Sequence, residues 1–200
     1  RYRMIKNIVF DMGNVLLNYN PQVPLDLFCS SEAEKNTIRK ELFEGAEWVE
    51  GDLGNITNEE KYERIRARIP QPMHEALKRC VYEWHICMEP LPGAKEFCGY
   101  LKGKGYALYV LSNASDDFYG YFPRFAPLSY FDGIVVSADV HMIKPDGRIY
   151  AYLLNQYGIK PQECLFIDDL ERNVEAAKGA GLAAEVFLGD FRCIKEKYIL

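Results

Sequence analysis

Ile5-Lys6-Asn7-Ile8-Val9-Phe10-Asp11-Met12-Gly13-Asn14-Val15-Leu16-Leu17 is the stretch that decides the fold. It begins as an apolar run, which is the pattern of a strand buried on both faces of a sheet. Asp11 ends the run and a Gly-Asn pair follows, so we expect the chain to turn where the carboxylate appears. Because an unpaired buried carboxylate is costly, Asp11 should face a crevice, a cation or a hydrogen-bond donor. In open parallel sheets that crevice lies beyond the carboxyl ends of the strands.

The composition excludes several classes of protein. The 200 residues are 48% hydrophobic and 26% charged, which suits one large domain or a core domain with a smaller insert. A net charge of -5 argues against a nucleic-acid-binding protein. The apolar runs fall short of the roughly 18 residues that a membrane span needs, and no signal-peptide pattern opens the chain. We therefore expect a cytoplasmic protein with neither nucleic acid nor membrane as a partner; its oligomeric state does not follow from the sequence.

The six cysteines are scattered along the chain without the spacing of metal ligands. We interpret them as reduced core residues of a cytosolic protein, so zinc is not expected.

Residues 18–90 lack strong strand patterns and are predicted to form several helices joined by polar turns. Asn20-Pro21 begins the first, and Ser30-Ser31-Glu32-Ala33-Glu34 resembles a capping box for the second. Thr57-Asn58-Glu59-Glu60 begins a third helix, and a fourth is expected over residues 73–88. These residues are therefore predicted to be a helical cap inserted after the first strand.

From residue 91 onward the chain alternates between helix and strand patterns. The predicted strands span 106–111, 131–136, 164–167 and 183–188, and the predicted helices span 93–102, 145–157 and 170–180. Such alternation requires crossover connections and a parallel sheet. We therefore expect an α/β fold, a doubly wound parallel sheet, with residues 1–17 and 91–200 as the core domain and 18–90 as the cap domain.

Polar groups end three of the predicted strands: Asp11, then Ser112-Asn113, then Asp168-Asp169. One parallel sheet would bring these ends around a common crevice. Lys144 precedes Pro145, which is expected to begin a helix, so the lysine should lie beside that helix N-terminus. Adjacent carboxylates repel one another unless a cation lies among them, and hard oxygen ligands without imidazole or thiolate suit Mg²⁺. A lysine and a Ser-Asn pair supply positive charge and donors for a phosphoryl group. An aspartate can attack phosphorus once the anionic ester has been neutralised in this way.

Four motifs, in order along the chain, resemble motifs I to IV of the haloacid dehalogenase-like (HAD) hydrolase superfamily. They are Asp11-x-Gly-Asn-Val, Leu111-Ser112-Asn113, Lys144-Pro145, and Asp168-Asp169 followed by Asn173. The resemblance covers nearly the whole chain, and the helical insert resembles the C1-type cap of that superfamily. Within it, the Phe-Asp-x-Gly-Asn-Val motif and the aromatic-rich segment 112–150 look most like phosphatases of the α-D-glucose-1-phosphate phosphatase type.

The resemblance implies a role for each matching residue. Asp11 would be the nucleophile, Ser112 and Asn113 would hold the phosphoryl oxygens, and Lys144 would pair with both the nucleophile and the phosphate. The implied activity is a Mg²⁺-dependent phosphomonoesterase that hydrolyses a small phosphorylated metabolite, a sugar phosphate by this subgroup, through an aspartyl-phosphate intermediate.

The implied magnesium ligands are Asp11 through its side chain, Gly13 through its backbone carbonyl, and Asp168 and Asp169 directly or through water. The sequence leaves open which of the last two is the direct ligand.

Gly13 departs from the pattern of the typical phosphatase of this superfamily, which carries an acid at that position for proton transfer. Another group or water would have to replace it, or the leaving group would need little help. Two alternatives follow: a metal-independent 2-haloacid dehalogenase, or a catalytically weak phosphate-binding protein. The Asp168-Asp169 pair argues against the dehalogenase, which works without metal.

Aromatic and titratable residues of the cap are further candidates to face the substrate: Glu47, Trp48, Trp84 and His85. For each of them, a place in the core of the cap or on its surface is expected ahead of a place facing the substrate. A second cluster, Tyr119, Tyr121, Phe122 and Phe125, follows the second strand and is expected to pack its loop against the core, or else to form an aromatic wall for a sugar ring.

Overall fold

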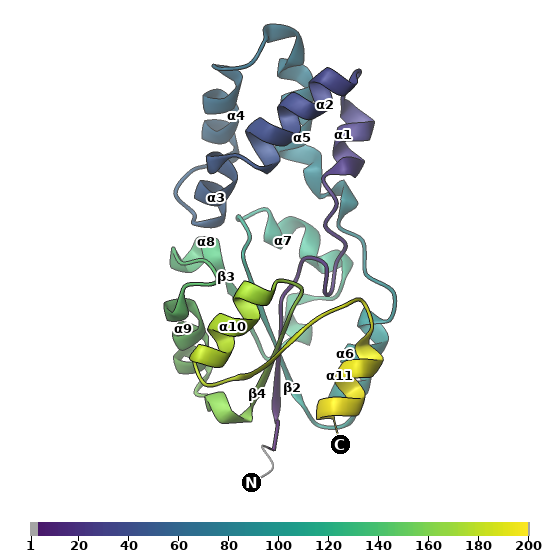
Figure 1. Cartoon of the computed structure of the whole chain (residues 1–200), viewed down its shortest axis with the longest axis vertical. Helices are drawn as coiled ribbons and strands as arrows, with labels where there is room; N and C mark the ends of the chain where they lie inside the picture. The colour runs from purple at the N-terminus through teal and green to yellow at the C-terminus, as the bar shows by residue number, and fades with distance from the viewer. Residues whose placement is uncertain (1–3, 200) are drawn as a thin grey trace.

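A five-stranded parallel sheet forms the centre of the computed structural model, which describes residues 4–199 (Figure 1). The strands are β1 (Asn7–Phe10), β2 (Ala107–Ser112), β3 (Gly133–Val136), β4 (Cys164–Asp168) and β5 (Ala183–Val186). Their order is β3-β2-β1-β4-β5, and all neighbours run parallel. The chain winds outward from β1 in both directions, which confirms the doubly wound fold and places the topological switch point at β1.

Successive residues of each strand face two different helical layers, because side chains alternate across a sheet. Ile8 and Phe10 belong to one buried cluster, whereas Val9 belongs to another on the opposite face. The first cluster includes residues of α6 (Ala94–Gly103) and α11 (Phe191–Tyr198), and the second includes residues of α9 (Gly147–Tyr157) and α10 (Glu171–Gly179). Strand β1 is therefore covered on both sides, as its apolar sequence predicted.

The cap lies beyond the carboxyl ends of the strands (Figure 1). Its helices are α1 (Gln22–Phe28), α2 (Glu32–Ile38), α3 (Ala46–Asp52), α4 (Asn58–Arg66) and α5 (His74–Glu83). Ser31 caps α2 by accepting a hydrogen bond from the backbone N–H of Glu34, and Thr57 and Glu60 form the reciprocal capping box of α4. Both helices therefore begin where the sequence predicted.

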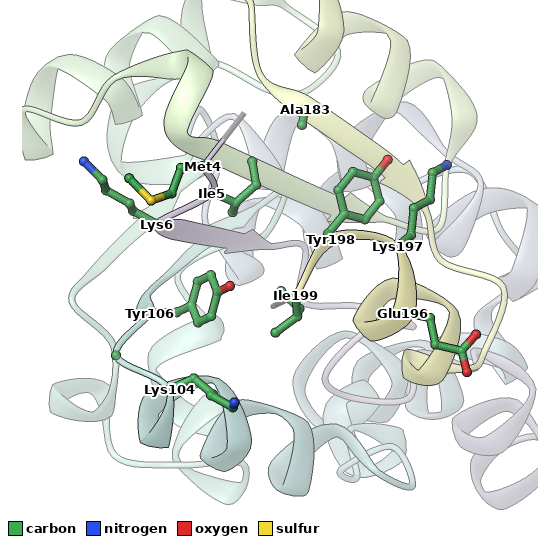
Figure 2. Close-up of a pocket in the computed structure, with 11 residues that line it drawn as sticks. Met4, Ile5, Lys6, Lys104, Tyr106, Ala183, Glu196, Lys197, Tyr198 and Ile199 are labelled. Atoms are coloured by element: carbon green, nitrogen blue, oxygen red, sulfur yellow. The ribbon is translucent and has the colours of Figure 1, made fainter. Parts of the chain in front are cut away.

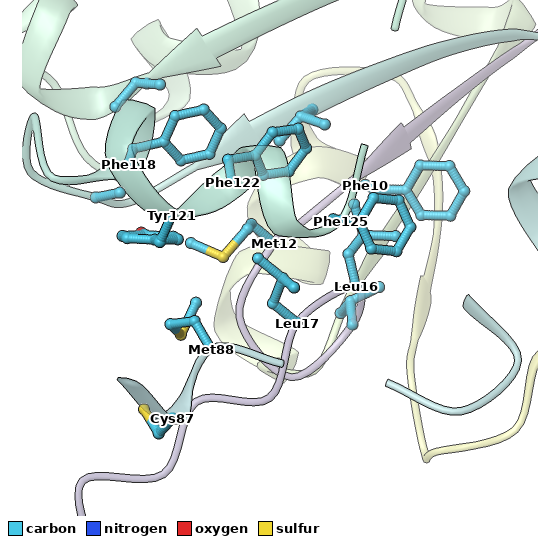
Figure 3. Packing of buried hydrophobic residues seen from close by; sticks show 14 of the residues in the cluster. Phe10, Met12, Leu16, Leu17, Cys87, Met88, Phe118, Tyr121, Phe122 and Phe125 are labelled. Carbon is cyan, nitrogen blue, oxygen red and sulfur yellow. The ribbon is translucent and has the colours of Figure 1, made fainter. Parts of the chain in front are cut away.

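Two extended segments lead into and out of the cap, and they lie side by side. The backbone N–H of Asn18 donates to the carbonyl of Glu89 at 2.7 Å, and that of Leu91 donates to the carbonyl of Leu16 at 2.9 Å. Apolar side chains of both segments join the buried cluster that contains Phe10 (Figure 3). The cap is thus attached to the sheet through a short paired connection next to the end of β1.

Four helices within residues 4–199 were not predicted from the sequence: α3, α7 (Phe118–Tyr121), α8 (Ser137–Val140) and α11. Helix α9 begins at Gly147 rather than at Pro145, because the side chain of Asp146 caps it by accepting a hydrogen bond from the backbone N–H of Arg148 at 2.9 Å. No helix between residues 4 and 199 is long and apolar enough to cross a membrane.

Candidate active site

Lys144 joins the ends of three adjacent strands. Its Nζ donates to Oδ1 of Asp11 at 2.7 Å, to Oδ2 of Asp168 at 2.9 Å and to the carbonyl of Leu111 at 2.8 Å. The side chain of Lys144 is 1% exposed and that of Asp168 is fully buried, whereas that of Asp11 remains 13% exposed. The lysine therefore fixes the Asp11 carboxylate in place while leaving part of it open to a ligand.

Burial and charge set the protonation of this group. Burial raises the pKa of Asp11 to about 7, and the positive charge of Lys144 opposes that rise. Burial alone would lower the pKa of Lys144, but the negative charges of Asp11 and Asp168 outweigh it and raise the pKa above its usual value. Lys144 is therefore charged, and one buried cation faces several carboxyl groups.

Three carboxylates gather at this point. Asp11, Asp168 and Asp169 each offer an oxygen, and these atoms lie within 4.8 Å of one another. Burial and the charge of Asp168 raise the pKa of Asp169. A divalent cation among them would relieve this repulsion, and the donor set of hard oxygens fits Mg²⁺.

The two neighbouring aspartates differ in what they contact. Asp168 accepts hydrogen bonds from the backbone N–H of Leu170 at 2.8 Å and from Nδ2 of Asn173 at 3.0 Å, besides the bond from Lys144. Asp169 is half-buried and lines the cavity in front of Asp11. The oxygens of Asp168 are thus occupied by protein donors, whereas Asp169 faces the open side.

Asn113 holds the loop of Lys144 to the end of β2. Its Oδ1 accepts from the backbone N–H of Lys144 at 2.8 Å, and its Nδ2 donates to the Lys144 carbonyl at 3.0 Å. Asn113, which the resemblance assigned to the phosphate, therefore also fixes the backbone of Lys144.

Three buried side-chain atoms have no hydrogen-bond partner among residues 4–199, namely Ser112 Oγ, Tyr121 Oη and Asn173 Oδ1. Buried polar groups are nearly always paired in folded proteins. Ser112 ends β2 next to the predicted site, and Tyr121 and Asn173 line the cavity. A ligand in the cavity could supply the missing partner of Tyr121 or Asn173, whereas Ser112 is not among the residues that line the cavity.

The cavity in front of Asp11 has a volume of about 440 Å³ and lies between core and cap. Asp11, Gly13, Asn113, Lys144 and Asp169 form its floor. Five aromatic side chains form a wall on the opposite side: Tyr19, Phe43, Trp48, Trp84 and Tyr121. The ring centres of Trp48 and Trp84, both from the cap, lie 5.1 Å apart, and that of Tyr121 of α7 lies 5.3 Å from that of Trp84. The rings of Tyr19 and Phe43 pack beside them.

The cap candidates named from the sequence divide into two pairs. Trp48 and Trp84 line the cavity. Glu47 instead forms an ion pair with Arg68 at 2.7 Å, and His85 contacts Arg124. Neither is among the residues that line the cavity.

Sequence reasoning missed several residues that line the cavity: Tyr19, Asp52, Ser115 and Arg172. Asp52 ends α3 in the loosely patterned stretch before Thr57, between Gly51 and Gly54. Those two glycines were its one sequence signal, since they indicate close approach of the backbone to another part of the chain.

A second cavity, of about 520 Å³, lies at the opposite end of the sheet (Figure 2). Lys6, Lys104 and Lys197 lie on different sides of it, and none of the site residues predicted from the sequence lines it. Lys6 pairs with Glu163 and Lys197 with Glu185, and all four side chains are at least 27% exposed. This cavity has basic groups but no buried charge.

Comparison with known proteins decides the family. The family model of haloacid dehalogenase-like hydrolases matches residues 5–181. The chain belongs to this family. It is therefore a hydrolase of the HAD type, as the four motifs implied.

Two curated relatives cover most of the chain. A sesquiterpene phosphatase of Aspergillus oryzae is 30% identical over 178 residues, which cover 88% of this chain and 87% of the relative. A phosphoglycolate phosphatase of Haemophilus influenzae is 24% identical over 195 residues, which cover 89% and 83%.

Among solved structures, a HAD family enzyme of Bacteroides thetaiotaomicron in complex with magnesium and inorganic phosphate aligns with a TM-score of 0.71. The alignment covers 95% of this chain and 98% of that chain at 22% sequence identity. This likeness confirms the fold.

Proposed function

We propose that the chain is a Mg²⁺-dependent phosphomonoesterase that acts on a small phosphorylated metabolite through an aspartyl-phosphate intermediate on Asp11. The observation that carries the proposal is the buried ion-paired centre, in which Lys144 fixes Asp11 at the end of the central strand and leaves that carboxylate accessible from the cavity. A held, partly open carboxylate beside a buried cation suits nucleophilic attack on an anionic ester. The phosphatase names of both curated relatives support the same reaction.

Four residues at or near the ends of the strands have proposed tasks. Asp11 attacks phosphorus, and Lys144 holds the nucleophile and offsets the charge of the phosphoryl group. The unpartnered hydroxyl of Ser112 donates to a phosphoryl oxygen. Asn113 positions Lys144 through the two hydrogen bonds described above and contributes its remaining donors to the phosphate.

Asp11, the carbonyl of Gly13, and Asp169 are the proposed direct ligands of Mg²⁺. Asp168 belongs to the same carboxylate group but is proposed to act mainly by holding Lys144, because protein donors already occupy both of its oxygens. When bound, Mg²⁺ supplies positive charge that lets the ester approach the carboxylate.

Residues 18–90 are proposed to act as the cap that closes the site and selects the substrate. A sugar phosphate is the substrate that the resemblance implies, and the aromatic wall offers flat apolar faces to such a ring. The same wall gives a second candidate, the phosphate ester of an apolar alcohol, because five aromatic side chains line the side where the alcohol would lie.

The comparisons do not favour the dehalogenase or the phosphate-binding protein, since the two curated relatives named above are phosphatases. A cytoplasmic location stays a prediction, supported by six free cysteines.

A phosphate-ester screen with and without Mg²⁺ tests the proposed function. The panel should include hexose 1- and 6-phosphates, isoprenyl monophosphates and 4-nitrophenyl phosphate. We expect Mg²⁺-dependent release of phosphate by the wild type and no release by Asp11→Asn, with Lys104→Met at the far end of the sheet as a matched control that retains activity. Turnover that survives Asp11→Asn, or that is unchanged by EDTA, would contradict the proposal.

A further inference from the structure

Breaking a phosphate ester releases an alkoxide, which leaves far more readily when a positioned acid protonates it. The floor of the cavity offers no free acid for this step. Both oxygens of Asp168 are occupied by donors, Asp11 is the proposed nucleophile, Asp169 is a proposed metal ligand, and Gly13 has no side chain. A proton donor therefore has to come from another wall of the cavity.

Asp52 is a carboxyl group on the cap side of that same cavity. It is the last residue of α3, and three contacts fix this end of the helix to the core. Ser137 Oγ donates to the backbone carbonyl of Asp52 at 2.5 Å, and Nδ1 of His141 lies 2.8 Å from the carbonyl of Leu53. Gly54 packs so closely that a Cβ there would lie 2.2 Å from the carbonyl oxygen of Ala138. The cap thus presents Asp52 to the site in a defined position.

The surroundings of Asp52 keep its proton available. Burial raises the pKa of Asp52 to about 7, while the charge of Lys61 and a backbone hydrogen bond from Ser115 oppose that rise and the charge of Asp117 adds to it. Asp117 itself accepts hydrogen bonds from Trp84 Nε1 at 2.9 Å and Asn58 Nδ2 at 2.8 Å. Asp52 therefore exchanges its proton near neutral pH, where general acids and bases work best.

Lys61 of α4 is the buried cation whose charge acts on Asp52. It is 2% exposed, its Nζ lies 4.8 Å from the centre of the Trp48 ring, and burial lowers its pKa. Gly51 makes room for it, since a Cβ at Gly51 would lie 2.9 Å from Nζ. The glycine inside α3, which costs helix stability, is thus explained by the buried lysine.

Tyr121 gives an independent sign of a ligand at this side of the cavity. The residue lines the cavity, and its hydroxyl is buried and has no hydrogen-bond partner among residues 4–199. Burial and then the charge of Asp52 raise the pKa of this hydroxyl well above its usual value, so it is a neutral donor. Figure 3 shows Tyr121 close to Met12 of the loop after β1; both belong to one buried cluster and both line the cavity.

We propose that Asp52 is the acid that protonates the leaving-group oxygen and the base that then activates water, and that Tyr121 Oη hydrogen-bonds the same leaving-group oxygen. This inference rests on the proposed function. It assigns the proton transfer to the cap, so the reaction can proceed only when cap and core are docked.

The proposed reaction has two steps. An oxygen of Asp11 bonds to phosphorus, the bond from phosphorus to the ester oxygen breaks, and that oxygen takes the proton of Asp52 and leaves as an alcohol. A water oxygen then attacks phosphorus while its proton passes to the Asp52 carboxylate. The acyl phosphate bond breaks with its electron pair returning to Asp11, and inorganic phosphate leaves.

The test compares Asp52→Asn with the wild type on two esters. The leaving group of 4-nitrophenyl phosphate departs without a proton, whereas that of benzyl phosphate needs one. We expect Asp52→Asn to lower kcat/KM for benzyl phosphate about 10²- to 10⁴-fold and to change kcat/KM for 4-nitrophenyl phosphate little. For the wild type, kcat/KM for benzyl phosphate should fall as pH rises through about 7, because the protonated carboxyl is lost, and Asp52→Asn should lack this fall.

Two further variants separate a chemical role from a structural one. Asp116→Asn changes an exposed acid of the same region that does not line the site, and it should behave as the wild type. Gly13 has room for a side chain, since a Cβ there would meet only Tyr19 Cβ at 3.6 Å. Gly13→Asp added to Asp52→Asn should therefore restore turnover of benzyl phosphate.

An equal loss on both esters, or an unchanged pH profile, would overturn the role of Asp52 while leaving the proposed function intact. A wild type that hydrolyses neither ester, or an Asp11→Asn variant that keeps activity, would overturn the proposed function and this inference with it.

Discussion

The two ends of the sheet each carry a cavity, and the two differ in the state of their charges. At the carboxyl ends of the strands, Lys144 is 1% exposed and contacts two carboxylates. At the amino ends, Lys6 is 51% exposed and Lys197 is 60% exposed, and each pairs with a surface glutamate. The cavity with exposed charges is the larger of the two, at about 520 Å³ against 440 Å³. Volume therefore does not distinguish the site, whereas buried, mutually fixed charges do.

The physical reason is the cost of taking charge out of water. Exposed ion pairs contribute about 0–1 kcal/mol and are lost easily. Burying an ion pair carries a large desolvation cost, which the attraction between the two partners offsets. Removing one partner therefore leaves the other charge buried and uncompensated. Function rather than stability accounts for keeping such an arrangement, because perturbed titratable groups cluster where chemistry is done.

Among substitutions at the two ends of the sheet, Lys144→Met should lower the free energy of unfolding the most. It leaves Asp11 and Asp168 facing each other without their cation, and we expect a loss of about 3–5 kcal/mol in the free energy of unfolding. Lys104→Met in the other cavity should cost less than about 1 kcal/mol. Urea unfolding of both variants measures the difference, and equal losses would contradict the contrast drawn between the two ends.

Mg²⁺ should stabilise the folded protein by binding at the carboxyl ends of the strands and not at the amino ends. At a concentration of about 100 times its Kd, Mg²⁺ should add about 2.7 kcal/mol to stability, seen as a rise in Tm that EDTA reverses. Asp169→Asn should remove this rise, and Glu196→Gln in the other cavity should keep it. A rise that persists in Asp169→Asn would place the ion elsewhere.

The Mg²⁺ effect should also depend on pH. Because the pKa of Asp11 is raised to about 7, its carboxyl holds a proton at lower pH that the metal must displace. Without metal, this raised pKa makes the folded state lose stability as pH rises from 3.8 towards about 7. The Mg²⁺-induced rise in Tm should therefore be larger at about pH 8 than at about pH 6. A rise that is larger at the lower pH would contradict the assignment of Asp11 as a ligand.

Gly54→Ala should cost more than Gly105→Ala, although both glycines have positive φ angles, +71° and +87°. A Cβ at Gly105, beside the second cavity, meets nothing within 4 Å, so backbone strain of about 1 kcal/mol is its whole cost. At Gly54 the clash with Ala138 adds to that strain and displaces Asp52. Both Tm and kcat/KM should fall further in Gly54→Ala than in Gly105→Ala. Equal losses would show that the contact between Gly54 and Ala138 does not hold the cap in place.

The smallest expected change concerns two tyrosine hydroxyls. Tyr121→Phe removes a hydroxyl without a protein partner, so stability should stay within about 0.5 kcal/mol while kcat/KM falls about tenfold. Tyr198→Phe removes a hydrogen bond to Glu185 beside the other cavity and should leave kcat/KM unchanged. A Tyr121→Phe variant that keeps full activity would show that the hydroxyl does not contact the substrate.

The carboxylates at the strand ends could be predicted from the sequence because topology alone brings strand ends together. Asp11 and Asp168 each sit at the end of an apolar run, and β1 and β4 are neighbours in the sheet. The wall could not be predicted in the same way. Asp52 reaches the cavity through contacts of α3 with Ser137 and His141, more than eighty residues later, and no local pattern encodes that docking.

The helices that were missed have a similar explanation. Helix α11 follows a capping Asp190 and packs Phe191 against Phe97 and Phe187, so its place is decided by tertiary contact. Helices α7 and α8 are only four residues long, too short to show a helical period in sequence.

The central claim is that Asp11 carries the phosphoryl group during turnover. Rapid acid quench of the wild type with Mg²⁺ and 4-nitrophenyl phosphate, followed by peptide mass spectrometry, tests it directly. We predict one phosphoryl group on Asp11 that disappears on chase and is absent in Asp11→Asn. Phosphate release without any phosphorylated Asp11, or with the group on another residue, would contradict the account.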